Sequence, residues 1–176
     1  GCAAVLNDKN LVTKIYFPRE VLPISFVTSN FINMLYSFIV VLIVVVLMGD
    51  HINFLAWIYL PIIMLVEYLL ALGCTLITSA LTVYFRDLQY FLGIVAMAWQ
   101  FLTPVMYSVD MVPDKLMPFF MMNPMTSIVI AYRDVLYYGQ IPAIETLALP
   151  LIISLIVLVL GELIFRCLQR NFAEEL

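Results

Sequence analysis

The sequence predicts an all-α, polytopic transmembrane bundle with four spans and a re-entrant helical hairpin. Hydrophobic residues make up 65% of the 176 positions and charged residues only 11%, whereas about a quarter of the residues in an average soluble domain are charged. Four apolar segments are each long enough, at about 20 residues, to cross a bilayer. The low charged fraction and the high hydrophobic fraction exclude an ordinary cytosolic domain and a disordered protein. The 8 basic side chains and the net charge of −4 provide no polybasic surface, which excludes a nucleic-acid binder.

The predicted spans follow the apolar runs in order: residues 24–48, 54–85, 88–107 and 146–165. The second would be roughly 45 Å long as an unbroken helix, which exceeds the ~30 Å hydrocarbon core of a bilayer. We therefore expect this span to tilt, to kink at Pro61 or to extend beyond the membrane.

The basic residues predict an orientation, because cytoplasmic loops are enriched in Lys and Arg. In a four-span topology, six basic residues share one side: Lys9, Lys14, Arg19, Arg86, Arg166 and Arg170. Lys115 and Arg133 lie on the other side. We expect the N-terminal stretch, the turn at 85–88 and the C-terminal tail to be cytoplasmic.

Polar side chains recur along the first two spans. On the first, a residue every fourth position forms one stripe, which fits either helix packing or the wall of a polar cavity; its members are Ser25, Ser29, Asn33 and Ser37. On the second, small residues between Ala71 and Thr82 form two rows. Rows of small residues favour close helix packing in lipid.

Glu67 lies near the middle of the second span. A carboxyl at that depth indicates a functional site by default, because its burial in lipid is costly. The alternative is a protonated or hydrogen-bonded side chain that faces a neighbouring helix. No Lys, Arg or His lies at a similar depth in another span, so a proton relay has no evident partner. Nearer the cytoplasmic side, Glu162 and Arg166 have the spacing of a local ion pair.

Residues 108–145 are predicted to fold back as a hairpin. Helix breakers, among them Pro113, Asn123 and Pro124, separate two apolar pieces at 115–122 and 125–138, each too short to span. Such pieces form re-entrant helices where protein or water satisfies the backbone. Two amphipathic helices resting on the outer leaflet are the alternative.

The sequence offers no catalytic or metal site. Its glycines open no G-x-x-x-x-G-K phosphate loop, and one His with three scattered Cys gives no metal-ligand spacing. Arg86 with Asp87, and Arg133 with Asp134, are adjacent pairs whose side chains diverge on a helix. We therefore expect no metal and no cofactor on this chain.

The first 23 residues mix apolar and basic side chains. Pro18 and Pro23 bracket a short element. A short amphipathic element at the cytoplasmic surface suits docking against a soluble partner, and resting on the membrane surface is the alternative.

Five motifs occur in order along the chain. They are the stretch 7–23 with K-I-Y-F-P-R-E, the stretch 71–88 that ends in Y-F-R-D-L, T-P-V-M-Y (103–107) with V-P (112–113), N-P-M-T (123–126) with Y-R-D (132–134), and F-A-E-E-L (172–176). In this order they resemble the membrane (permease) subunits of ABC type-2 transporters that export polysaccharides. Since those subunits have six spans, the resemblance implies a C-terminal fragment, and the initial Gly1 also suggests a fragment.

The resemblance implies a transport subunit, not an enzyme, in the bacterial inner membrane. Such permeases form homodimers, pair with a separate ABC ATPase that binds ATP and Mg, and move lipid-linked O-antigen, capsule or teichoic-acid chains. The residues that it assigns are Tyr16, Phe17, Pro18, Arg19 and Glu20 in a coupling helix, Arg86 and Asp87 in the cytoplasmic turn, Tyr36, Trp99, Phe101 and Tyr107 along the channel, and Pro113, Asn123, Pro124 and Arg133 in the gate. Helix packing is an equally good interpretation of each aromatic, and Glu67 is not part of the motifs.

The implied organisation has four parts. A cytoplasmic loop with the coupling helix covers 1–23, three spans cover 24–107, a periplasmic gate hairpin covers 108–145, and the last span with its cytoplasmic tail covers 146–176. The alternatives are an exporter of drugs or lipo-oligosaccharides from the same superfamily, a membrane-embedded glycosyl- or acyl-transferase that relies on Arg86 and Asp87, and a membrane anchor without transport activity.

Overall fold

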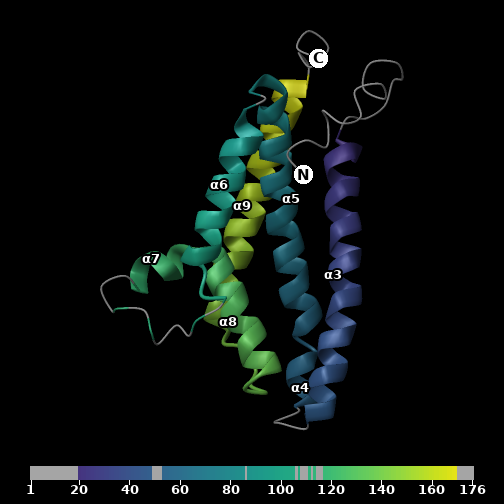
Figure 1. The fold of residues 1–176 in the computed structure, drawn as a ribbon, viewed down its shortest axis with the longest axis vertical. Coiled ribbons are helices and arrows are strands. Elements are labelled where there is room, and N and C mark those ends of the chain that lie inside the picture. The colour runs from purple at the N-terminus through teal and green to yellow at the C-terminus, as the bar shows by residue number, and fades with distance from the viewer. Residues whose placement is uncertain are drawn as a thin grey trace. The chain divides into compact units, whose positions relative to one another are not determined.

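The computed structural model describes residues 20–48, 53–85, 87–105, 107, 111, 113 and 117–169. Within these residues all regular elements are helical, which confirms the all-α prediction. The helices, labelled in Figure 1, are α3 (Val21–Met48), α4 (Phe54–Trp57), α5 (Leu60–Tyr84), α6 (Leu88–Leu102), α7 (Met117–Met122), α8 (Pro124–Leu136) and α9 (Ile144–Leu168).

Three stretches of the described chain are long and apolar enough to cross a membrane: Val21–Leu47, Phe54–Tyr84 and Ile144–Leu168. The predicted third span does not reach that length. Its helix, α6, has 15 residues and is therefore about 22 Å long, shorter than the ~30 Å core. Pro104 explains the early end, because it lacks an amide hydrogen and disfavours the helical conformation in the residue before it.

Two prolines lie at helix starts, where their missing amide hydrogens cost nothing. Helix α3 begins at Val21 rather than after Pro23, so this proline sits in the first turn of the span instead of ending the preceding element. The second predicted span is interrupted at Ile58 and Tyr59, and Pro61 lies in the first turn of α5. The first amides of a helix have no partner within it, which makes the first turn the tolerated place for proline.

The helices pack as two compact units. The first consists of the described parts of Gly1–Met34, Tyr68–Ile94 and Leu155–Leu176, and the second of those of Leu35–Glu67 and Val95–Ser154.

In the first unit, α5 and α9 cross at backbone contact (Figure 1). A Cβ atom on Gly161 would lie 2.6 Å from the carbonyl oxygen of Gly73, and a Cβ atom on Gly73 would lie 2.7 Å from the amide nitrogen of Leu158. Beside the crossing, a buried apolar cluster contains Leu22, Leu76, Ala80, Val83 and Phe165. The small-residue prediction for this span is thus right about close packing, although the closest contact is made by glycine.

The small and polar rows of the sequence have different surroundings. Ser79 and Thr82 on α5 are buried, whereas Ala71 is exposed. The stripe on α3 is exposed throughout: Ser25, Ser29, Asn33 and Ser37. The choice between helix packing and a polar cavity wall for this stripe therefore stays open.

In the second unit, α8 packs against α7 and α4. Its buried face consists of Thr126, Ser127, Ile128, Ala131 and Val135. The buried hydroxyl of Ser154 on α9 donates to the carbonyl oxygens of Pro150, at 2.6 Å, and of Val66 on α5, at 3.3 Å. This side chain joins two long helices close to the proline inside α9.

Candidate functional site

The hairpin helix α8 begins at the Asn-Pro pair. The Asn123 Oδ1 atom accepts a hydrogen bond from the amide of Met125 at 3.1 Å, and Pro124 occupies the start of the helix. Asparagine is among the best N-cap residues, and proline suits the first helical position. The predicted breaker pair therefore defines where the second piece of the hairpin starts.

Asn123 also ties this start to the end of α6. The Trp99 indole Nε1 donates to Asn123 Oδ1 at 3.2 Å, and Asn123 Nδ2 donates to the hydroxyl of Thr103 at 3.0 Å. That hydroxyl in turn donates to the carbonyl oxygen of Trp99 at 3.0 Å. A predicted channel aromatic and a predicted gate residue thus share one hydrogen-bond network.

Arg133 holds the irregular segment that follows α6. Its guanidinium donates to the carbonyl oxygens of Pro104, at 3.1 Å, and Tyr107, at 3.2 Å. The Tyr107 hydroxyl donates to the carbonyl oxygen of Phe101 at 2.8 Å. Backbone carbonyls outside a helix need partners when they are removed from water, and Arg133 supplies donors to two of them. The T-P-V-M-Y, N-P and Y-R-D motifs therefore meet in one cluster.

Aromatic side chains surround the same cluster. The Tyr107 and Phe120 rings meet edge-on with centroids 6.4 Å apart. A cavity of about 480 Å³ is lined by Trp99, Leu102, Phe119, Phe120, Met122, Asn123 and Pro124. Both amide atoms of Asn123 are engaged in the network, so this cavity presents chiefly apolar groups.

The acidic neighbour of Arg133 is partly buried. Burial raises the pKa of the Asp134 carboxyl above its usual value, and the adjacent Arg133 guanidinium opposes that shift. The carbonyl oxygen of Asp134 accepts from the amide of Gln140 at 2.9 Å, beside Gly139, whose φ of 59° lies in the left-handed region that favours glycine. Helix α8 therefore ends in a compact turn.

The intramembrane acid Glu67 has a partner that sequence reasoning missed. The Tyr132 hydroxyl of α8 donates to Glu67 Oε2 at 2.7 Å. The Tyr132 ring packs against Phe38 with ring centroids 5.5 Å apart. A search for basic partners could not find this pair, but the tyrosine of the Y-R-D motif was a visible signal. The contact agrees with the interpretation of Glu67 as a hydrogen-bonded carboxyl facing another helix.

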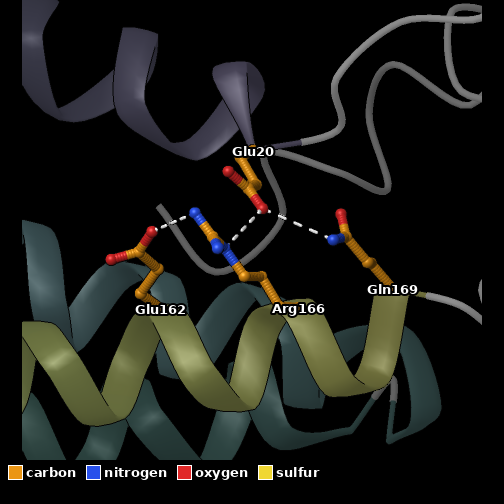
Figure 2. A network of polar contacts seen from close by, with 4 residues as sticks. All are labelled: Glu20, Glu162, Arg166 and Gln169. Atoms are coloured by element: carbon orange, nitrogen blue, oxygen red, sulfur yellow. Dashed lines mark hydrogen bonds and ion pairs between the residues drawn. The ribbon is translucent and has the colours of Figure 1, made fainter.

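A polar network joins the start of α3 to the end of α9 (Figure 2). Glu20 Oε1 lies 3.5 Å from Arg166 Nε and accepts a hydrogen bond of 3.4 Å from Gln169 Nε2. Arg166 also pairs with Glu162 one turn earlier on α9, as the spacing of the two residues predicts. Glu20, a residue of the predicted coupling helix, is thereby fixed to α9.

The other predicted site residues lie apart from these networks or outside the described residues. Tyr36 on α3 and Phe101 on α6 have largely exposed side chains, at 66% and 73%. Asp87 is exposed, and its carbonyl oxygen accepts from amides of the first turn of α6. Pro113 is also exposed. Outside the described residues lie Tyr16, Phe17, Pro18, Arg19 and Arg86.

Comparison with known sequences decides the family. The family described as ABC-2 type transporter matches residues 4–137. The chain belongs to this family. It is a multi-pass membrane transport subunit rather than an enzyme, and membership implies an ABC ATPase as its partner.

Relatives over the whole chain are permeases. The chain is 30% identical over 178 residues to the O-antigen export system permease protein RfbA of Myxococcus xanthus, an alignment that covers 100% of this chain and 68% of the relative. Two proteins of the same name from Klebsiella pneumoniae are each 29% identical over 172 residues, covering 97% of this chain and 66% of the relative. The chain thus spans about two thirds of the length of these permeases.

Proposed function

We propose that this chain forms part of the permease subunit of an ATP-driven exporter that moves a lipid-linked polysaccharide of the O-antigen class across the bacterial inner membrane. The observation that carries this proposal is the similarity, along the whole chain, to permeases named for O-antigen export. The permease would act as a homodimer, with ATP and Mg bound by the partner ATPase.

The contact between the start of α3 and the end of α9 fits such a role. The motif at 14–20, proposed to dock in the ATPase, ends at Glu20, whose carboxylate pairs with Arg166 on α9. A movement of the ATPase would therefore act directly on two helices, α3 and α9. The N-terminal stretch and the C-terminal tail would lie in the cytoplasm, as the distribution of basic residues favours.

The cluster around Asn123 and Arg133 fits the predicted periplasmic gate. It connects the hairpin helices to α6 and to the segment that follows α6 through side-chain hydrogen bonds. Such polar contacts can be exchanged for contacts with water or sugar hydroxyls when the hairpin moves. Trp99 and Phe119 would offer ring faces to a passing glycan, since their side chains are 42% and 73% exposed.

Deletion of the gene in its own bacterium tests the proposal. We expect the deletion strain to lose surface polysaccharide and to accumulate the lipid-linked chain inside, and a plasmid copy of the full-length permease to restore export. The tagged permease should co-purify with a P-loop ATPase encoded nearby.

Three results would contradict this function. One is a deletion strain that keeps its surface polysaccharide, and another is a purified permease without an ATPase. The third is a change in drug resistance alone, which would favour a drug exporter of the same superfamily.

A further inference from the structure

The network at the C-terminal end of α9 contains an ion pair, between Glu20 and Arg166, that helix stability does not require. Glu20 Oε1 contacts two side chains, that of Arg166 on α9 at 3.5 Å and that of Gln169, just after α9, at 3.4 Å (Figure 2). The side chains of Arg166 and Glu20 are 60% and 29% exposed. Ion pairs with this exposure add little to folding stability. What the contact does provide is a defined position of Glu20 relative to the last turns of α9.

Arg166 is held in place to receive Glu20. Glu162, one turn earlier on α9, pairs with the Arg166 guanidinium through Nη2, which leaves Nε directed at Glu20. The guanidinium therefore bridges two carboxylates, one on its own helix and one at the start of α3. A planar fork of donors suits this bridging role better than the point charge of a lysine.

The end of α9 cannot shift independently of α5. Phe165 is fully buried in the apolar cluster with Leu76 and Val83. The Tyr84 hydroxyl donates to the carbonyl oxygen of Leu168 at 2.9 Å, and α9 crosses α5 in backbone contact at Gly161. A displacement applied to Arg166 is therefore passed to both α9 and α5.

We propose that Arg166 is a positioning residue that transmits movement of the coupling helix to α9, through its ion pair with Glu20. This inference rests on the proposed export function, in which the ATPase moves the segment that ends at Glu20. Loss of the pair leaves the ATPase bound and active while its movement no longer reaches α9. The expected defect is uncoupling, with ATP hydrolysis retained and export reduced.

Charge reversal in the full-length permease, expressed with its ATPase in the native bacterium, tests the inference. Arg166→Glu and Glu20→Arg are compared with the double variant, which restores opposite charges. We expect each single variant to lower surface polysaccharide about tenfold, and the double variant to recover at least about half of it, as residues in direct contact do in a double-mutant cycle. ATP hydrolysis by the purified Arg166→Glu complex should stay within about twofold of the wild type.

Controls separate uncoupling from misfolding. Cys167→Ser changes the exposed neighbour of Arg166 and should export like the wild type. Arg166→Ala provides a milder variant. For every variant we would also measure the amount of permease in the membrane, which reports folding, and its elution with the ATPase, which reports binding of the partner.

Three results would overturn the role of Arg166. They are unchanged export in both single variants, no recovery in the double variant, and loss of the ATPase from the Arg166→Glu complex, which would place Arg166 in the docking surface itself. A failure of the proposed export function is distinguishable, because the wild-type permease would then neither export polysaccharide nor bind an ATPase.

Discussion

Gly161→Ala tests whether backbone contact between α5 and α9 holds the first unit together. The added Cβ atom would lie 2.6 Å from the Gly73 carbonyl oxygen, and ordinary contact begins at 3.4 Å, so one backbone must move by about 0.8 Å. A backbone atom cannot rotate away as a side chain can. Overpacking of this kind costs about 1–3 kcal/mol, and the gain in helix propensity from Gly to Ala, about 1 kcal/mol in water, offsets part of that cost.

The matched control is Gly93→Ala on α6, because no atom lies within 4 Å of the position that its Cβ would occupy. Both variants receive the same propensity gain, so the difference between them isolates the clash. We expect Gly161→Ala to be less stable than Gly93→Ala by about 1–3 kcal/mol. The assay is unfolding of the purified permease by dodecyl sulfate in mixed micelles, followed by loss of helical circular dichroism. Equal stability of the two variants would refute the crossing as described.

Three further substitutions test the second unit. Tyr132→Phe keeps the ring but removes the hydroxyl that donates to Glu67, and should lower stability by about 1–3 kcal/mol in the same assay because a partly buried carboxyl loses its partner; unfolding that coincides with the wild type would contradict this. Asn123→Ala removes the α8 cap and the Trp99 contact, at a cost of about 1 kcal/mol, whereas Asn123→Asp, which keeps a capping oxygen, should lose less. Arg133→Gln removes donors from two carbonyls after α6, so limited proteolysis of that segment should become faster; an unchanged cleavage rate would argue against the contact.

Local chemistry in the sequence is sufficient to predict two features, the start of α8 and an ion pair on α9. Asn123 and Pro124 are adjacent, and their preferences for the N-cap and the first helical position determine where α8 begins. The Glu162–Arg166 pair follows from the spacing of four residues on one helix. These features depend only on neighbours along the chain, which is why sequence reasoning reaches them.

The end of α6 differs from the span boundary that composition predicts. Residues 88–107 are apolar enough for a span, but Pro104 ends the helix at Leu102. Hydropathy measures transfer to lipid, whereas helix continuity depends on amide donors and backbone conformation. The irregular segment that follows is stabilised by Arg133, a residue whose role could not be read from its neighbours in sequence.

Composition and motifs are sufficient to assign the class of the protein: an apolar, charge-poor chain of membrane helices whose motifs resemble those of an ABC type-2 permease. The folded chain is needed to see which distant residues meet, namely Tyr132 with Glu67, Glu20 with Arg166, and Gly161 with Gly73. The physical reason is that hydrophobicity and helix propensity act along the chain, whereas these contacts depend on the register and closeness with which helices pack. A change of one residue in that register rotates a side chain by about 100° around its helix and removes the contact.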